Sequence, residues 1–323
     1  MAENAAAQPD PRRTRIPLVF RQPLPRSRAA DVDGLQGSPR GRLRFRSPGQ
    51  GADHPPDLPV TAMDTEACLG IIDWGIGGVG LVGALDRLVP GLPVLYWSDA
   101  GATPYGLMDS DELTDRLMRV VTALAERGAT EVVLACNAAS TVVSRLGSAP
   151  VAVEGIIAHG LASVPEDISS VGVVGGQRTI DAGHYERGLA RPGRLVLSRV
   201  AQPLSAHIEA GRAGSARFNT DLADIVAPLH RVAALVLACT HYPAARRWFA
   251  AALPDTLLID PAGHLAAAIA YRYPDAAPGS TPARKTFLTT GDPDAMRRNA
   301  ARAWGTLLTT RAVPRRDRSA LAS

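Results

Sequence analysis

From residue 69 onward, short apolar runs alternate with longer stretches whose apolar positions recur at helical spacing. Several runs are continuous in Val, Ile and Leu, which is typical of parallel strands that are covered on both faces. The predicted strands are 69–73, 94–97, 131–135, 151–153, 170–174, 195–198, 234–238 and 256–259. The predicted helices are 81–88, 111–127, 140–146, 179–189, 205–211, 221–230, 244–252, 263–271 and 294–304. This alternation predicts an α/β fold with mostly parallel sheets.

One motif occurs twice in this pattern. Two apolar runs stop at a cysteine followed by a small polar residue, at Cys136-Asn137 and at Cys239-Thr240, and the cysteines lie 103 residues apart. The strands that begin at Leu69 and Val171 repeat with nearly the same offset. Two matches at one spacing indicate a duplicated α/β unit. Because ligands bind at the carboxyl ends of parallel strands, we expect both thiols to face one cleft between the two units.

The domain boundaries follow from this layout. We predict a first α/β domain from residues 66–159 together with 262–310, and a second from residues 160–261. Residues 1–65 are rich in Pro and Arg without apolar periodicity, so they are predicted to be a disordered tail. Residues 311–323 are predicted to be a loose C-terminal tail.

Charge narrows the choice of partners. Residues 1–62 hold ten Arg and six acidic residues, so residues 63–323 carry no net charge, and Met63 is an alternative start. Arg without interleaved aromatic residues is typical of surface charge, so we expect neither a nucleic-acid nor a membrane partner. The Arg pair at 12–13 has no apolar core behind it, and no apolar run approaches the ~20 residues that span a bilayer. Together with three cysteines that lack disulfide or zinc spacing, this favours a cytoplasmic protein.

Cofactor chemistry has few candidate residues. Lys285 is the only lysine of the chain and lies beside a proline-rich stretch, which makes it a poor Schiff-base residue. No dinucleotide fingerprint stands between a strand and a helix. His159, His184, His207 and His264 are isolated in the sequence without metal-ligand spacing, so we expect no metal site and no cofactor.

The two repeated cysteines are the best candidates for catalysis. Each stands where a strand enters a predicted helix, and backbone N–H dipoles there favour a thiolate. His241 lies two residues beyond Cys239, and Asp73 ends the strand predicted to neighbour the one before Cys136. A single cysteine after an apolar run is more often a buried small side chain, and Cys68 is interpreted so. The duplicated context of the other two favours a function.

Two glycine-containing turns follow strand ends that carry acids. Asp73-Trp-Gly-Ile-Gly-Gly78 allows close backbone approach to a ligand, and Asp99-Ala-Gly-Ala-Thr-Pro-Tyr-Gly106 is typical of an ordered turn. Each turn alone could serve packing only.

These motifs occur in the same order as those of the glutamate racemase family, within the aspartate/glutamate racemase superfamily. The chain resembles this family over roughly residues 67–310. The similar stretches are Asp73–Gly78, Asp99–Gly106, Cys136-Asn-Ala-Ala-Ser140, Gly175-Gly-Gln-Arg-Thr179, Cys239-Thr-His-Tyr-Pro243 and Thr290-Gly-Asp-Pro293. The resemblance implies two pseudo-symmetric domains, no cofactor, and proton transfer at the α-carbon between two cysteines. It also implies a small amino-acid substrate and the supply of D-glutamate for peptidoglycan.

The resemblance implies roles residue by residue. Cys136 and Cys239 would be the acid/base pair, assisted by Asp73 and His241 respectively. The residues that would bind substrate are Asn137, Thr240, Pro104, Tyr105, Gly106, Trp74, Thr179 and Glu209.

Three hydroxyl groups of the family pattern are missing here. Trp74 replaces a serine, and Ala138 and Gly176 replace threonines. Hydrogen bonds to charged groups are worth about 1.5–3 kcal/mol each, so these losses bear on the substrate. Two alternatives therefore stay open: a racemase or isomerase for another amino acid or related acid, and an inactive relative that binds a ligand or protein. Whether the protein forms a homodimer is also open.

Overall fold

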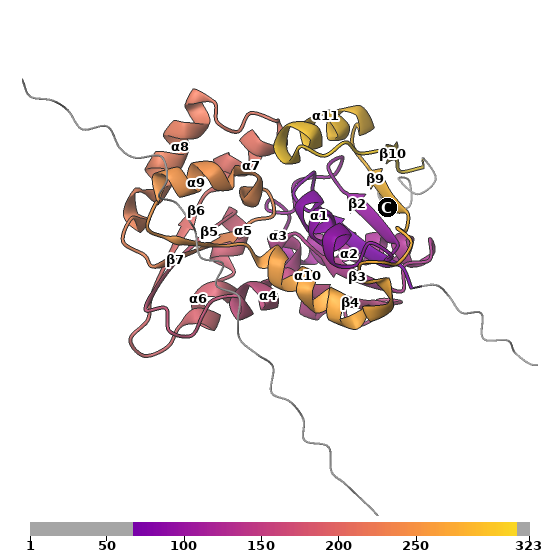
Figure 1. The fold of residues 1–323 in the computed structure, drawn as a ribbon, viewed down its shortest axis with the longest axis horizontal. Helices are drawn as coiled ribbons and strands as arrows, with labels where there is room; N and C mark the ends of the chain where they lie inside the picture. The colour runs from indigo at the N-terminus through magenta and orange to yellow at the C-terminus, as the bar shows by residue number, and fades with distance from the viewer. Residues whose placement is uncertain (1–66, 315–323) are drawn as a thin grey trace, which may run out of the picture. The chain divides into compact units, whose positions relative to one another are not determined.

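The computed structural model describes residues 67–314, so the predicted tail at residues 1–65 lies outside the described residues. Two parallel sheets lie side by side, the first on the right of Figure 1 and the second on the left. The first sheet has the order β10 (Thr310–Ala312), β9 (Lys285–Thr289), β2 (Val94–Ser98), β1 (Leu69–Asp73), β3 (Glu131–Leu134), β4 (Ala152–Gly155). The second has the order β6 (Leu195–Val200), β5 (Ser170–Gly175), β7 (Ala234–Ala238), β8 (Leu257–Ile259). The α/β prediction is confirmed.

Helices cover both faces of each sheet. They are α1 (Val79–Leu88), α2 (Ser110–Ala125), α3 (Asn137–Ser140), α4 (Ile156–Ala162), α5 (Gln177–Asp181), α6 (His184–Leu189), α7 (Gln202–Glu209), α8 (Ala216–Val226), α9 (Arg246–Ala252), α10 (Pro261–Arg272) and α11 (Pro293–Trp304). The short 3₁₀ helices are η1 (Val143–Arg145), η2 (Ala227–Leu229), η3 (Tyr242–Ala245) and η4 (Pro274–Ala276).

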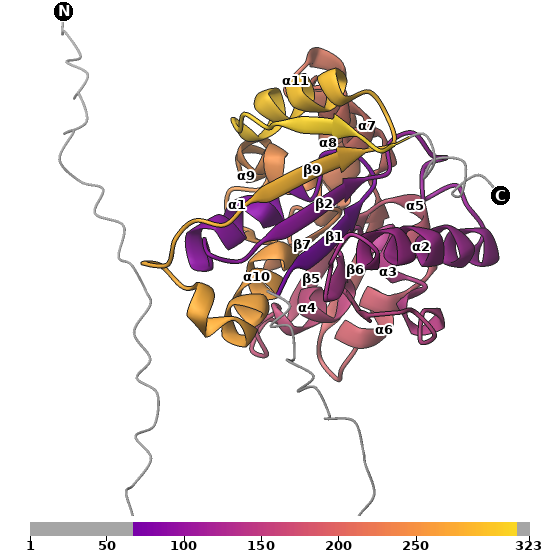
Figure 2. The same ribbon diagram turned by 90° about the vertical axis from the view of Figure 1, so that its right-hand side faces the viewer.

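The central strands β1 and β7 are rich in apolar residues because both of their faces are buried. In β1, Ile71 packs into the cluster with α1 and α10, while Ile72 packs into the cluster with α2. Figure 2 shows these helices on opposite sides of β1 and β2. The same alternation in β7 sends Val236 and Leu237 into two different clusters. This two-sided burial is the physical reason for continuous rather than alternating apolar runs.

Several helices begin earlier than the apolar pattern predicts because a polar side chain caps them. Asp109 accepts hydrogen bonds from the backbone N–H groups of Asp111 and Glu112 at the start of α2. Ser215, Asp260 and Asp292 cap α8, α10 and α11 in the same way. Capping satisfies N–H groups that have no partner inside the helix.

Some predicted elements need correction. The helix predicted at 179–189 is two helices, since Gly183 adopts the left-handed conformation (φ 64°) between α5 and α6. α4, β9 and β10 were not predicted. β10 contains Arg311 and Ala312, which the pattern assigned to a loose tail.

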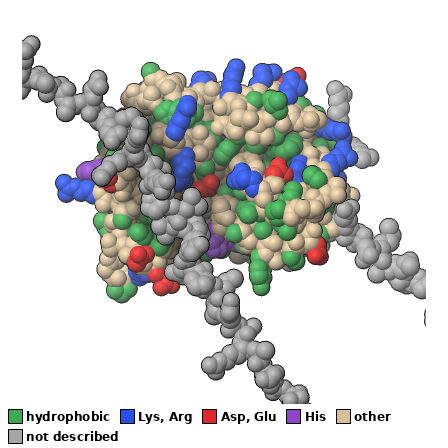
Figure 3. Space-filling model, viewed as in Figure 1, with side chains coloured by type: hydrophobic (Ala, Val, Ile, Leu, Met, Phe, Trp, Pro, Cys, Tyr) green, Lys and Arg blue, Asp and Glu red, His purple; other side chains and the backbone are tan. Residues whose placement is uncertain are grey.

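The chain leaves the first sheet after β4 and returns with α10, which packs against α1 and α4. α11 then contacts both α1 and α7. Its buried residues Met296 and Ala300 lie one turn apart. Basic side chains lie along the upper edge of the molecule in Figure 3, the edge at which Figure 1 shows α11. Among the described residues, no helix is long and apolar enough to cross a membrane.

Candidate active site

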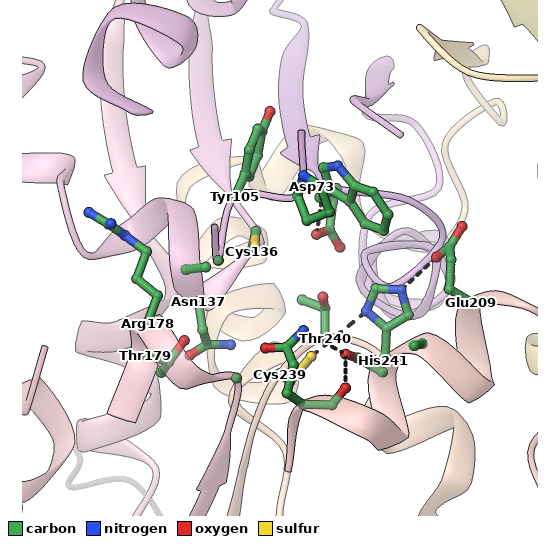
Figure 4. Close-up of a pocket in the computed structure, with 18 of the residues that line it drawn as sticks. Asp73, Tyr105, Cys136, Asn137, Arg178, Thr179, Glu209, Cys239, Thr240 and His241 are labelled. Carbon is green, nitrogen blue, oxygen red and sulfur yellow. Dashed lines mark hydrogen bonds and ion pairs between the residues drawn. The ribbon is translucent and has the colours of Figure 1, made fainter. Parts of the chain in front are cut away.

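A cavity of about 370 Å³ lies at the carboxyl ends of both sheets. The strands β1 and β3 lead into Asp73 and Cys136, and β5 and β7 lead into Gly176 and Cys239. Every predicted site residue lines this cavity: Asp73, Trp74, Pro104, Tyr105, Gly106, Cys136, Asn137, Thr179, Glu209, Cys239, Thr240 and His241. Figure 4 shows Cys136 and Cys239 entering it from different elements.

The turn after β1 brings the two halves of the cavity together. Gly75 has φ 95°, and a β-carbon there would lie 2.2 Å from the Glu209 carboxylate. A β-carbon at Gly77 would lie 2.3 Å from Thr240 Oγ1. The backbone N–H of Ile76 donates to Glu209 Oε2 at 2.9 Å. Glycine is needed at both positions because the second half of the site packs directly on this backbone.

His241 links Cys239 to Glu209. Its Nδ1 lies 3.7 Å from Cys239 Sγ, and its Nε2 lies 2.6 Å from Glu209 Oε2. Burial alone would lower the pKa of His241, but hydrogen bonds with Cys239 and Glu209 outweigh it and raise the pKa well above its usual value. The imidazole is therefore held protonated beside the thiol.

Cys136 has a different environment. It precedes α3, where N–H groups lower the pKa of the thiol, but burial and then the negative charge of Asp73 raise that pKa well above its usual value. The expected preference for a thiolate at Cys136 is therefore wrong: helix α3 has only four residues and does not offset burial. Burial also raises the pKa of Asp73 to about 6, although His241 and Thr240 act against it.

Two buried polar atoms at the cavity have no hydrogen-bond partner among the described residues. They are Asp73 Oδ2 and Asn137 Nδ2. The remaining polar atom of each side chain has a partner: Asp73 Oδ1 accepts from the Trp74 N–H at 2.7 Å, and Asn137 Oδ1 accepts from the Tyr185 hydroxyl at 2.8 Å. An unpaired buried acceptor and donor beside Cys136 can serve a ligand without a change of rotamer.

The loop at Pro104–Gly106 is anchored by a buried ion pair. The Tyr105 hydroxyl donates a hydrogen bond to Asp99 Oδ2 at 2.9 Å, and Arg116 donates to both oxygens of that carboxylate at 2.8 and 2.6 Å. Asp99 is fully buried and does not line the cavity. It therefore positions the loop.

The indole of Trp74 lines the cavity and is fixed at one end. Its Nε1–H donates to the backbone carbonyl of Ala102 at 3.1 Å, and its ring packs against the core cluster on the α2 side. The indole ring is therefore a fixed part of the cavity wall.

Sequence reasoning found Glu209 of α7 and Thr179 of α5 but missed other residues of these two helices. Gln202, Ser205 and Ala206 line the cavity together with Glu209, at positions i, i+3, i+4 and i+7 of one helix face. Counting back from Glu209 by helical spacing would have found them. Arg178 of α5 also lines the cavity, but its hydrogen-bond partners lie far away in the sequence.

Two of the histidines treated as isolated are neighbours. Nδ1 of His159 lies 3.0 Å from Nδ1 of His264, and His159 Nε2 lies 2.7 Å from Glu154 Oε1. The sequence does not show this because α4 and α10 meet only in the fold. Within residues 67–314, no group of three or more potential ligands could hold a metal ion.

This geometry suits proton transfer. Two thiols reach one cavity from separate sheets, one beside a carboxyl group with a pKa about 6 and one beside a protonated imidazole. Groups that exchange protons near neutral pH are what general acid–base catalysis requires.

The family model described as Asp/Glu/Hydantoin racemase matches residues 69–269. A glutamate racemase of Pseudomonas entomophila is 31% identical over 256 residues, which cover 75% of this chain and 95% of the relative. One of Limosilactobacillus reuteri is 31% identical over 202 residues, covering 60% and 76%. The solved glutamate racemase of Thermus thermophilus, in complex with beta-chloro-D-alanine, has a TM-score of 0.70 at 27% identity and covers 79% of this chain and 99% of that chain.

Proposed function

Because this chain belongs to the Asp/Glu/hydantoin racemase family and is an amino-acid racemase on that ground, we propose that it interconverts L- and D-glutamate. The reaction is a two-base proton transfer at the α-carbon, carried out by Cys136 and Cys239 without a cofactor. The product supports peptidoglycan synthesis in the cytoplasm. One observation carries the proposal: two cysteines that follow strands of different sheets line the same cavity.

In each direction, one sulfur removes the α-proton and the other donates a proton to the opposite face of the carbon. The His241 imidazolium, which Glu209 holds in orientation, donates a proton to the Cys239 thiolate, and the resulting neutral imidazole takes a proton back from the thiol. Cys136 has Asp73 as its nearby carboxyl group, and the pKa of about 6 lets Asp73 accept a proton at neutral pH. After one turnover the protonation states of the two thiols are exchanged.

The substrate carboxylate next to the α-carbon needs hydrogen-bond donors between the thiols. Asn137 Nδ2 is a buried donor without a partner among the described residues, and Thr240 lies directly after Cys239. Held by these groups, the α-carbon lies between the two sulfurs and its side chain extends toward Pro104–Gly106. Positioning of this kind lowers the barrier because the reacting atoms are already aligned.

The test is solvent deuterium uptake at the α-carbon of L- and D-glutamate, followed by NMR. The wild-type protein should exchange both enantiomers. Cys136→Ala and Cys239→Ala should each abolish racemisation, because one face of the carbon loses its proton source. Cys68→Ala is the matched control, since Cys68 does not line the cavity, and it should keep full activity. Retained racemisation in either of the first two variants would contradict the two-cysteine mechanism.

One observation favours a second candidate, a racemase for another amino acid. The fixed Trp74 indole adds a large apolar surface to the cavity wall, and Ala138 and Gly176 offer no hydroxyl there. Deuterium exchange across aspartate and bulkier, less charged amino acids would distinguish the two. Faster exchange with an apolar amino acid than with glutamate would favour this candidate, and no exchange with any would favour a binding protein.

A further inference from the structure

Gln202 is an exposed residue that lines the cavity, and one backbone hydrogen bond orients its side-chain amide. Its Oε1 accepts a hydrogen bond from the backbone N–H of Gln177 at 3.2 Å. A backbone N–H can only donate, so the oxygen must face α5 and the NH₂ group must face away from it. That NH₂ lies 3.4 Å from Ser205 Oγ, a long contact that leaves its donor capacity largely unused.

Gly176 makes room for this amide. A β-carbon at residue 176 would lie 2.8 Å from Gln202 Oε1, closer than a real β-carbon approaches another atom. The N-cap residue Gly176 has no side chain to cap α5, and the Gln202 oxygen accepts from the first N–H group of this helix instead. A side chain at residue 176 and the amide of Gln202 therefore exclude each other from the same space.

Gln202 also faces the opposite half of the cavity. A β-carbon at Gly106, in the loop of the first sheet, would lie 3.7 Å from Gln202 Oε1. The amide therefore lies close to the loop that contains Gly106. In the proposed binding mode, this loop lies at the distal end of the substrate.

The charges near this end favour an anion. Figure 4 places Arg178 and Thr179 at one end of the cavity, and Glu209 and His241 at the other. The acidic lining residues are Asp73 and Glu209, and Glu209 is paired with His241. Arg178 follows Gln177, whose N–H binds Gln202, so it brings a positive charge to the Gln202 end of the cavity.

We propose that Gln202, in the space left by Gly176, is the specificity residue for the distal carboxylate of a dicarboxylic amino acid. Its NH₂ group donates to that carboxylate, and it replaces hydroxyl donors that this cavity lacks at residues 138 and 176. This inference rests on the proposed racemase function of the same cavity. It goes further by assigning the choice of substrate to one side chain.

The first test is Gln202→Glu. One carboxylate oxygen can still accept from the Gln177 N–H, while the other puts a negative acceptor where the NH₂ donor was. We expect KM for glutamate to rise at least about tenfold with kcat changed less than about threefold, because the interaction is remote from the reacting carbon. Gln177→Ala is the control: its side chain lies outside the cavity and binds Asp181, so the change should alter KM less than about twofold.

The second test uses the exclusion between residues 176 and 202. Gly176→Ser should displace the amide and raise KM, and Gln202→Ala should raise KM by removing the donor. The double variant Gly176→Ser/Gln202→Ala should have a lower KM than Gly176→Ser alone, since the serine then has room. Such coupling is expected only for side chains that share one space. Thermal unfolding of all three variants establishes that they fold.

If Gln202→Glu does not fold, Gln202→Met gives the same test, because it keeps the length and removes the NH₂. Wild-type exchange of glutamate with an unchanged KM in the Gln202 variants would overturn this inference and leave the proposed function standing. Absence of glutamate and aspartate exchange by the wild-type protein would overturn both.

Discussion

The two thiols of the cavity have neighbours of opposite charge. Cys136 lies in the field of the Asp73 carboxylate, which raises the pKa of the thiol, while Cys239 contacts an imidazole that Glu209 keeps protonated. The two sulfurs are therefore not interchangeable, although the residues around them repeat in the sequence. In the proposed mechanism, each thiol has a different partner with which it gains and loses a proton.

Asp73 couples this chemistry to stability. Its pKa in the folded protein is about 6, above the value of 3.8 for an exposed aspartate, so the folded state binds the proton more tightly than the unfolded state. Ionising Asp73 in the folded protein therefore lowers the free energy of unfolding. This loss is absent below about pH 4, grows between about pH 4 and pH 6, and reaches about 3 kcal/mol above about pH 6.

We predict that Asp73→Asn stabilises the protein above about pH 6 by up to about 3 kcal/mol and has little effect near pH 4. Asn keeps the oxygen that accepts from the Trp74 N–H. The same change should lower the racemisation rate about 10²- to 10⁴-fold, because a proton acceptor is lost. Urea unfolding at the two pH values measures the first effect. An equal free energy of unfolding for both proteins above about pH 6 would contradict it.

Site residues that belong to a sequence motif could be predicted, and those that reach the cavity only through the fold could not. Asp73, Cys136, Cys239 and His241 stand at strand ends or beside them, so parallel topology brings each to the carboxyl edge of its own sheet. Helical spacing from Glu209 places Gln202 on the cavity face of α7, but its contact with Gly176, which follows another strand of the second sheet, depends on the fold. The charge state of Cys136 also depends on burial, which sequence neighbours do not show.

Among the structural elements, the turn between β1 and α1 has the tightest contacts with the site. A β-carbon at Gly77 would lie 2.3 Å from Thr240 Oγ1 and 2.8 Å from His241 Nδ1. The Cys-Thr-His segment therefore packs directly against this turn.

We predict that Gly77→Ala lowers kcat/KM about 100-fold or more, because even a shift of about 1 Å misaligns reacting groups. Gly83→Ala in α1 is the matched control. Its new β-carbon would meet only the flexible end of Arg87 at 4.0 Å, and it should stabilise the helix by about 0.5–1 kcal/mol. Steady-state kinetics and thermal unfolding of both variants measure these effects. Full activity of Gly77→Ala would show that the turn does not position the site.

Elements with continuous apolar runs were predicted well, and those with mixed composition were missed. β9 begins with Lys285 and Thr286, and β10 has three residues including Arg311, so neither shows a buried-strand pattern. Both lie at one edge of the first sheet, where pairing is decided by neighbouring strands. α4 is short and contains Gly160, which is required because a β-carbon there would lie 2.2 Å from the Tyr185 hydroxyl.

At the scale of the molecule, the cavity exists only while the two sheets hold their relative position. Glu209 is one link, through the Ile76 N–H. Arg178 of α5 is a second link with three hydrogen bonds: to Thr141 Oγ1 at 2.9 Å, to the Met108 carbonyl at 2.8 Å and to Ser110 Oγ at 2.9 Å. All three acceptors belong to the part of the chain that surrounds the first sheet.

We predict that Arg178→Met loosens the contact between the two halves and raises KM for glutamate about tenfold or more, because hydrogen bonds from a guanidinium are individually worth about 1.5–3 kcal/mol. Amide hydrogen exchange should become faster in residues 105–110 and 141–145, while β1 and β7 stay protected. Arg199→Met is the matched control: Arg199 is exposed on β6, and no hydrogen bond or ion pair of its side chain is found within residues 67–314. Unchanged KM and exchange in Arg178→Met would mean that Glu209 and the glycine turn alone hold the cavity closed.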